Sequence, residues 1–335
     1  MPGVKPLRLV VMGTGPFAVP MFRALVASPH EIVAVVTRPD HAPPGRRPPP
    51  NPMRKAAVAA GLPVLDPERA NEPESVAAVR GLAPDLLVVC DYGQLLSAEL
   101  LEVPPLGGIN LHGSLLPRHR GAAPIQWAIL AGDPVTGVSV IGMTPRLDAG
   151  RVITARETPI GPRETAAELE ERLAEIGAEA VLDAIERLEA TVAAGHDPAE
   201  VGIPQEEATA TRAPRLAKAD GIVDWSRPAA AIERMRRAFD PWPRAVTFFE
   251  RGDGERQRLV LAVVEVAFPE EFPAPAAEPG TVIATESAPD PGRIVVACGG
   301  GTAVSLTRLV PEGKRAMTAG EFLRGSPLGA GSRLG

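Results

Sequence analysis

Short apolar runs alternate with amphipathic segments along the first half of the chain. Each run is four to seven residues long, and the segments between the runs carry apolar residues at helical spacing. This alternation predicts a mostly parallel sheet covered by helices, which is a Rossmann-like, doubly wound α/β fold. The predicted strands are 7–12, 31–37, 62–65, 85–90, 108–111 and 138–143, and the predicted helices are 17–27, 52–60, 75–82 and 125–131.

A longer amphipathic stretch follows these elements. Residues 165–188 repeat apolar side chains every three to five positions, which predicts one long helix at the end of a first domain, 1–189. The next residues, 190–208, have few large apolar side chains and many Pro, Gly and acidic residues, so we interpret them as an inter-domain linker. The repeating apolar positions of the helix are Leu169, Leu173, Ile176, Ala180 and Ile185.

Residues 209–325 carry a different pattern. A predicted helix at 229–239 precedes five short β-type runs that are separated by turn signals. Short strands of this kind indicate a small β-barrel as a second, C-terminal domain. The five runs are 245–249, 259–267, 280–284, 293–297 and 303–309.

Composition narrows the class of protein. Hydrophobic residues make up 45% of the 335, which is enough for real cores and excludes a wholly disordered chain. Cys90 and Cys298 are far apart and form no Cys-x-x-Cys pair, so we expect two buried thiols instead of a disulfide or a zinc site. No apolar run is long enough for a membrane span or a signal sequence. We therefore expect a cytoplasmic protein with no membrane partner.

Acidic and basic residues are concentrated in different segments of the chain, so the net charge alone does not describe its surface. The net charge of −6 argues against a nucleic-acid partner, but residues 157–200 alone hold twelve acids and three bases. Residues 208–259 hold eleven bases and seven acids, and residues 37–55 hold five bases and one acid. Local basic segments can steer a polyanion even when the whole chain is acidic, so charge alone leaves both ordinary solvated faces and a nucleic-acid site open.

A glycine-rich turn follows the first predicted strand. Gly13, Gly15 and Ala18 fit the G-x-G-x-x-G/A dinucleotide fingerprint between a strand and a helix. The acidic residue that should end the second strand is missing, and Asp40 lies beyond a proline. We therefore rank a nicotinamide-dependent oxidoreductase last and interpret the turn as an ordinary feature of a doubly wound domain.

Polar residues concentrate in an otherwise apolar stretch at 108–148. Asn110 and His112 alternate on one predicted strand and so share a face, and Asp148 follows a later strand. An amide can stabilise an oxyanion, an imidazole can carry a proton, and a carboxylate can orient the imidazole and support its charge. Together they suit transfer of a carbonyl group, although each residue alone has a structural explanation, such as a cap.

Several motifs resemble one enzyme family. The residues from Asn110 to Pro117 read Asn-Leu-His-Gly-Ser-Leu-Leu-Pro and closely resemble the signature of folate-dependent formyltransferases. The stretches 120–126, 136–138 and 147–150 are similar to the branch that acts on methionyl-tRNA. Further matches extend the resemblance over nearly the whole chain; they lie at 13–18, 37–55, 84–85, 92–93, 222–225, 238–243, 280–282 and 313–317.

The resemblance implies an activity and a set of site residues. It implies transfer of the formyl group of 10-formyltetrahydrofolate to the α-amine of initiator methionyl-tRNA, by a monomer with no metal and with an OB-like, tRNA-binding second domain. Asn110 and a protonated His112 would stabilise the oxygen, while Asp148 would hold His112 and help to move the amine proton to the departing nitrogen. The implied folate contacts are Ser114, Leu115, Leu116 and Pro117, and the predicted tRNA contacts are Arg38, Arg46, Arg47 and Lys218.

Some positions depart from the family pattern. The basic loop continues with Arg47 and three prolines where the family has glycine and lysines, Asp91 stands where a small residue is usual, and Ser97 replaces a proline. The main alternative is a formyltransferase for another amine, such as an amino-sugar nucleotide. A catalytically silent folate- or RNA-binding protein is a further alternative, which the intact Asn110, His112 and Asp148 argue against.

Overall fold

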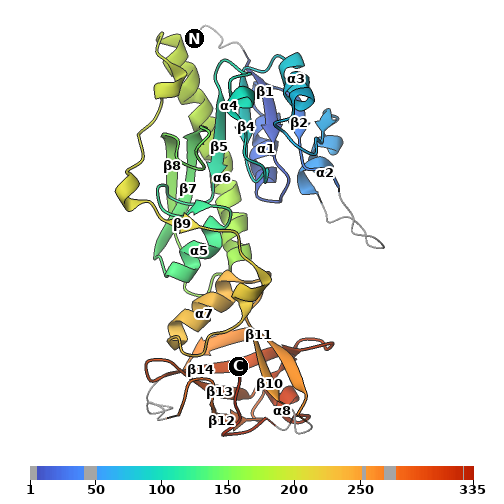
Figure 1. Ribbon diagram of the computed structural model, residues 1–335, viewed down its shortest axis with the longest axis vertical. Helices are drawn as coiled ribbons and strands as arrows, with labels where there is room; N and C mark the ends of the chain where they lie inside the picture. Colours follow the sequence, from blue (N-terminus) through green and yellow to red (C-terminus); the bar gives the residue numbers. More distant parts are fainter. Residues whose placement is uncertain (1–5, 41–50, 251–253, 268–276, 327) are drawn as a thin grey trace. The chain divides into compact units, whose positions relative to one another are not determined.

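The computed structural model describes residues 6–40, 51–250, 254–267, 277–326 and 328–335. The chain divides into two compact units, each with its own sheet (Figure 1). The domain boundaries predicted from the sequence stay a prediction. The first unit comprises Met1–Ile125, Pro134–Ile160 and Glu168–Arg215, and the second comprises Gln126–Asp133, Gly161–Ala167 and Leu216–Gly335.

A seven-stranded sheet forms the centre of the first unit. Its order is β3-β2-β1-β4-β5-β7-β8; the first five strands run parallel, and β7 pairs antiparallel with both β5 and β8. The predicted mostly parallel, doubly wound sheet is thereby confirmed, while β8 was not predicted. The strands are β1 (Arg8–Met12), β2 (Glu31–Val36), β3 (Val64–Leu65), β4 (Leu86–Val89), β5 (Gly108–His112), β7 (Val135–Gly142) and β8 (Val152–Pro159).

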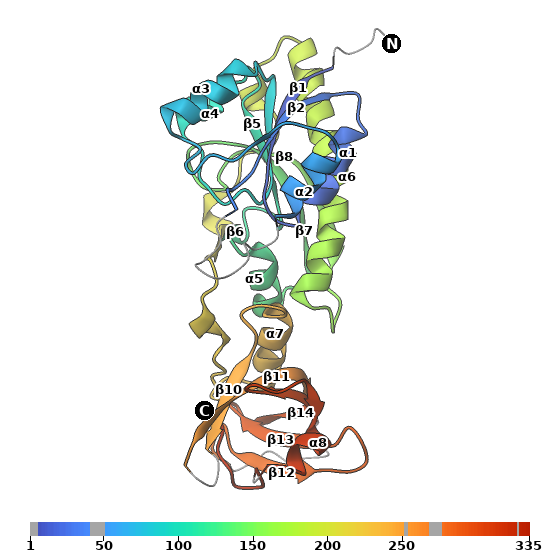
Figure 2. The same cartoon turned by 90° about the vertical axis from the view of Figure 1, so that its right-hand side faces the viewer.

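Helices cover both faces of this sheet. Figure 2 shows α1 and α6 on one face and α3 and α4 on the other. The helices of this unit are α1 (Ala18–Val26), α2 (Pro52–Ala59), α3 (Pro73–Gly81), α4 (Ala98–Leu101) and most of α6 (Ala166–Ala193), while most of α5 (Pro124–Ala131) belongs to the second unit.

Close packing of α6 against β5 fixes which way the polar residues of β5 point. A Cβ atom on Gly177 of α6 would lie 2.7 Å from Cδ2 of Leu111, so only glycine allows this approach. Because side chains alternate along a strand, Asn110 and His112 point to the face opposite Leu111. The long helix therefore leaves the polar face of β5 uncovered by its own side chains.

The glycine-rich turn after β1 has a packing explanation. A Cβ atom on Gly13 would come within 2.8 Å of the Cys90 carbonyl oxygen, and one on Gly15 would clash with the Asp91 carboxylate. The end of the neighbouring strand β4 therefore requires both glycines. This finding supports the interpretation of the turn as an ordinary feature of the fold.

The second unit holds a curled antiparallel sheet. Its order is β10-β11-β14-β13-β12, with β15 paired to β14. Backbone bridges join Leu334 to Phe249 beside β10 and Arg333 to Thr281 beside β12, so one segment links the two edges of the sheet. The predicted small, OB-like barrel is confirmed. Its elements are α7 (Ala229–Ala238), β10 (Val246–Glu250), β11 (Arg256–Val266), β12 (Val282–Glu286), β13 (Arg293–Cys298), β14 (Thr302–Pro311), β15 (Met317–Thr318) and α8 (Ala319–Leu323).

Two further expectations concern the whole chain. Cys90 and Cys298 are buried free thiols, as predicted. Within the described ranges, no helix is both long enough and apolar enough to cross a membrane.

Candidate active site

The polar face of β5 forms the base of the site. β5 lies between the parallel β4 and the antiparallel β7, with Asn110 beside Val89 and His112 beside Ser139. His112 is only 5% exposed, whereas Asn110 is half-buried. No hydrogen bond ties the Asn110 side chain to another residue that the structure describes, so its amide can bind a substrate oxygen.

The third predicted residue lies next to His112. Asp148 belongs to the loop between β7 and β8, and its Oδ2 is 3.8 Å from Nδ1 of His112. The two side chains are 6% and 10% exposed, so little solvent screens their interaction. Oδ2 also accepts a hydrogen bond of 2.9 Å from the backbone N–H of Gly121, and Asp148 has a φ of 48°, a left-handed conformation that aspartate tolerates.

A backbone carbonyl determines the tautomer of His112. Nε2 lies 2.9 Å from the carbonyl oxygen of His119, which can only accept a hydrogen bond, so Nε2 carries a proton. Nδ1, the nitrogen that faces Asp148, is then the basic atom of the neutral ring. Burial lowers the pKa of His112 below 6.5, and the charges of Asp148 and His119 act in opposite directions on it. The free protein therefore holds a neutral imidazole at pH 7.

The four residues predicted to contact folate differ in how deeply they are buried. Ser114 is fully buried, and its hydroxyl donates to the carbonyl oxygen of Arg118 over 2.6 Å, so this side chain shapes the loop. Leu115, Leu116 and Pro117 are half-buried and follow directly after β5. Their contact with folate stays a prediction.

The predicted tRNA contacts lie in both units. Arg38 is half-buried in the first unit, where Nη1 donates to the carbonyl oxygen of Gly93 over 3.2 Å. Lys218 is exposed in the second unit. Arg46 and Arg47 lie outside the described residues. All four contacts stay predictions.

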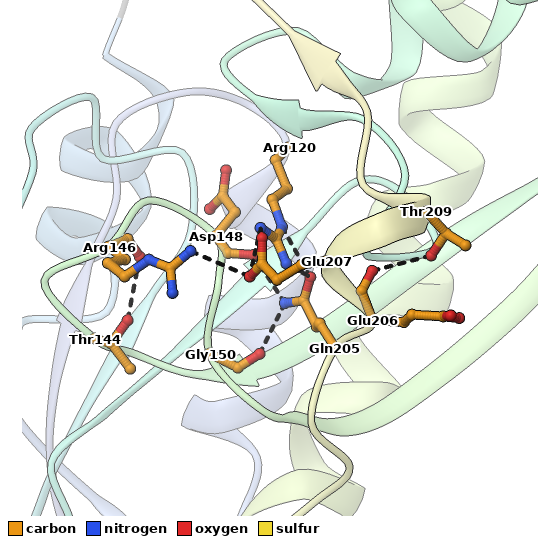
Figure 3. A network of polar contacts seen from close by, with 9 residues as sticks. All are labelled: Arg120, Thr144, Arg146, Asp148, Gly150, Gln205, Glu206, Glu207 and Thr209. Atoms are coloured by element: carbon orange, nitrogen blue, oxygen red, sulfur yellow. Dashed lines mark hydrogen bonds and ion pairs between the residues drawn. The ribbon is translucent and has the colours of Figure 1, made fainter.

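Other groups at the site were not predicted from the sequence. The backbone N–H of Gly121 and the carbonyl of His119 hold the two catalytic candidates, and no side-chain pattern signals a backbone contact. Arg120 and Gln205 lie beside Asp148 and are hydrogen-bonded to each other (Figure 3). Gln205 was missed because it lies in the segment that we interpreted as a linker.

Both units correspond to domains of known proteins. The profile of the formyl transferase domain matches residues 7–185, and that of the formyl transferase C-terminal domain matches residues 215–327. The chain belongs to the formyl transferase family. The methionyl-tRNA formyltransferase of Rhodopirellula baltica is 44% identical over 335 aligned residues, which cover 98% of this chain and 96% of the relative. That of Symbiobacterium thermophilum is 43% identical, with 98% and 95% covered.

Solved structures share the formyl transferase fold. HypX from Aquifex aeolicus in complex with tetrahydrofolic acid aligns with a TM-score of 0.60 at 19% identity, over 96% of this chain and 48% of that chain. The sugar 3N-formyl transferase WlaRD aligns with a TM-score of 0.60 at 13% identity, over 90% and 97%. At these identities the likeness concerns the fold alone.

The carboxyl of Asp91, in the loop after β4, has a perturbed pKa. Burial raises the pKa of its carboxyl from 3.8 to about 6, although a hydrogen bond from the Gly15 backbone lowers this pKa in part. Asp91 as a residue is exposed, so solvent screens part of this effect. Because this carboxyl pKa is raised, the stability that Asp91 contributes is fully present below pH 3.8 and is lost as pH rises through about 6.

At pH values above 6, Asp91→Asn is therefore expected to raise the midpoint temperature of thermal unfolding. Near pH 4 the substitution should leave that temperature unchanged. Asparagine keeps the shape and tolerates the φ of 48° at this position. Thermal melts at pH 4, 5, 6 and 7 measure the effect. A gain of equal size at every pH would show that the carboxyl does not titrate in this window.

Proposed function

We propose that the chain transfers the formyl group of 10-formyltetrahydrofolate to the α-amine of initiator methionyl-tRNA, giving N-formylmethionyl-tRNA. The observation that carries the proposal is the similarity of 43–44% over 98% of the chain to curated methionyl-tRNA formyltransferases. The buried His112–Asp148 pair supports it, as does the Asn110 amide, which has no hydrogen-bond partner among the described residues, because formyl transfer needs an oxyanion site and a proton carrier.

The site residues fit the steps of this reaction. The amine nitrogen attacks the formyl carbon, a new C–N bond forms, and the carbonyl electron pair moves to oxygen, where the Asn110 amide donates a hydrogen bond. His112 takes the amine proton at Nδ1, which is unprotonated in the resting protein. The carboxylate of Asp148, 3.8 Å away, stabilises the imidazolium that results. The proton then passes to the folate nitrogen as its bond to the formyl carbon breaks.

Apolar groups at the same edge of the sheet suit a folate ring. The parallel strands β4 and β5 are neighbours, so the loops that follow them leave the sheet at one edge. The first loop holds Leu95, which is 62% exposed, and the second holds the half-buried Leu115 to Pro117. The neighbour HypX, solved with tetrahydrofolic acid, supports a folate co-substrate.

A formylation assay tests the proposed function. Purified protein is incubated with 10-formyltetrahydrofolate and either initiator methionyl-tRNA or an amino-sugar nucleotide, and the formylated product is measured. We expect rapid turnover with the tRNA alone. Turnover with the sugar nucleotide alone would favour the other acceptor, and folate or tRNA binding without any turnover would favour a silent binding protein.

The proposal also assigns a setting to the reaction. Methionyl-tRNA is a cytoplasmic substrate of translation, so the proposal places the protein in the cytoplasm. A monomer without a metal ion is the form that we propose to be active. Treatment with a chelator tests whether the reaction needs a metal ion. We expect the same rate of formylation before and after the treatment.

Arg46→Ala is expected to raise the KM for methionyl-tRNA about tenfold, because a charge-assisted contact to phosphate contributes roughly 1.5 kcal/mol. The slope of log affinity against log salt should fall by about 1, since one phosphate contact disappears. The KM for folate should not change. Arg69→Ala, at an arginine whose side chain is 79% exposed, is the control and should behave like the wild type. Equal changes in both KM values would instead indicate a folding defect.

A further inference from the structure

The segment 203–213 of the first unit contacts both loops that build the site. It begins with a pair of backbone hydrogen bonds of 2.9 Å. The N–H of Ile203 donates to the carbonyl of Val152, and the N–H of Val152 donates to the carbonyl of Ile203. It ends in the short parallel pairing of Arg212 and Ala213 with Arg120 and Gly121. We call this stretch the 203–213 strap.

Gln205 connects the loop of Asp148 to Arg120. Its Nε2 donates to the backbone carbonyls of Asp148, over 2.8 Å, and Gly150, over 2.7 Å. Its Oε1 accepts two hydrogen bonds from Arg120, from Nε over 3.0 Å and from Nη2 over 2.8 Å. The amide of Gln205 thus uses both its N–H donors and its acceptor oxygen, and it links two loops, as Figure 3 shows.

Glu207 completes the network on the same side. Its carboxylate accepts from Nη1 of Arg120 at 3.0 Å and from Nη2 of Arg146 at 3.2 Å. The Arg120 side chain is 12% exposed, so its hydrogen bonds to Gln205 are poorly solvated and strong, whereas the Glu207 side chain is 57% exposed and solvent screens its contacts. Arg146 and Asp148 belong to one loop, and Glu207 therefore fastens that loop a second time.

The strap also holds the backbone groups that touch the catalytic candidates. The hydroxyl of Thr211 accepts from the N–H of His119 over 2.8 Å, and its carbonyl accepts from the N–H of Arg120 over 2.9 Å. The carbonyl of His119 in turn accepts from His112, and the N–H of Gly121 donates to Asp148. Gly121 allows the close pairing, since a Cβ atom there would clash with the Ala213 carbonyl.

We propose that Gln205, supported by Glu207, is a positioning residue that holds Asp148 against His112 during formyl transfer. The inference rests on the proposed function for its kinetic part. Asp148 sits in a left-handed backbone conformation, which aspartate tolerates but which surrounding contacts must hold against more extended alternatives. The two hydrogen bonds from Gln205 to the carbonyls of residues 148 and 150 fasten the loop here, and displacement of the carboxylate by about 1 Å is enough to slow catalysis about 10²-fold.

Gln205→Ala is expected to lower kcat about 10²-fold while both KM values stay within about threefold of the wild type. Gln205→Glu keeps an acceptor for Arg120 but loses the donors to the two carbonyls, so it should not restore kcat. The matched control is Glu206→Ala, because Glu206 is an exposed neighbour on the strap and contacts Thr209 through its backbone carbonyl. The control should retain kcat within twofold.

Titration of His112 by NMR tests the same idea without turnover. The His112 signal is assigned by its loss in His112→Asn, and its midpoint is compared between wild type and Gln205→Ala. Burial lowers the pKa of His112, Asp148 and the hydrogen bond to the His119 carbonyl raise it, and the charge of His119 lowers it. If Asp148 moves away, the midpoint should fall below the wild-type value. Failure of the wild type to transfer formyl groups would overturn the proposed function, whereas an unchanged His112 midpoint would overturn the positioning role alone.

Folding defects are separated by the unfolding midpoint. If Gln205→Ala does not fold, Glu207→Gln decides the question, because it keeps the size of the side chain but removes the charge and one of the two acceptor oxygens that the arginines contact. We then expect a kcat about tenfold below that of the wild type. A kcat within twofold of the wild type in folded Gln205→Ala, or in Glu207→Gln where the first variant is unfolded, overturns the proposal.

Discussion

His112→Ala is expected to lower kcat for formyl transfer by about 10²–10⁴-fold, the usual contribution of one general acid–base group. The basic Nδ1 of this ring faces Asp148, and alanine leaves no atom there that can take up or return a proton. The KM values should change little, because the substrate contacts that we propose lie on Asn110 and on the loop after β5.

Single-turnover formylation measures this effect, with His196→Ala as the matched control, since His196 is an exposed histidine of the same unit. The control should turn over like the wild type. His112 is buried, so an unfolding curve must show that the alanine variant remains folded. Turnover within tenfold of the wild type in a folded His112→Ala protein would remove His112 from the mechanism.

Asp148→Asn is expected to lower kcat by about 10²–10³-fold, the range found when one group that stabilises developing charge is removed. Asparagine keeps the size, tolerates the φ of 48° and can still accept from the N–H of Gly121. It lacks the negative charge, so the imidazolium that forms on His112 loses its stabilising partner, which lies 3.8 Å away. The variant thus separates charge from shape.

The pH dependence of kcat/KM provides the direct measurement. The wild type should lose activity as pH falls through the lowered pKa of His112, because a protonated ring cannot take the amine proton. Asp148 raises that pKa, so in Asp148→Asn the acid limb should move to lower pH, while burial and the charge of His119 still lower it. An acid limb at the same pH in both proteins would show that Asp148 does not act on His112.

The core of the site could be predicted because strand geometry fixes it. Residues at positions 110 and 112 of one strand must share a face, and helix α6 covers the other face through Leu111. The alternation of apolar strands and helices likewise predicted the parallel sheet. By contrast β8 was missed, because this edge strand contains the half-buried Arg156 and the exposed Glu157 and lacks a continuous apolar run.

The supports of the site could not be predicted, since they depend on contacts between distant segments. Gln205 lies 57 positions from Asp148 and 85 from Arg120, in a stretch that is poor in large apolar residues and looks like a linker. Its contacts are made to backbone carbonyls and to one arginine, and neither leaves a periodic pattern. The backbone groups of His119 and Gly121 are equally invisible in side-chain patterns.

A double-mutant cycle on single-turnover formyl transfer tests most directly whether the His112 imidazole and the Asp148 carboxylate act together in catalysis. The rate constants of wild type, His112→Ala, Asp148→Ala and the double variant are compared under the same conditions. If Asp148 acts through His112, the double variant should be no slower than His112→Ala alone. If the two losses multiply in the double variant, the two side chains act independently, and the mechanism derived from their 3.8 Å separation is contradicted.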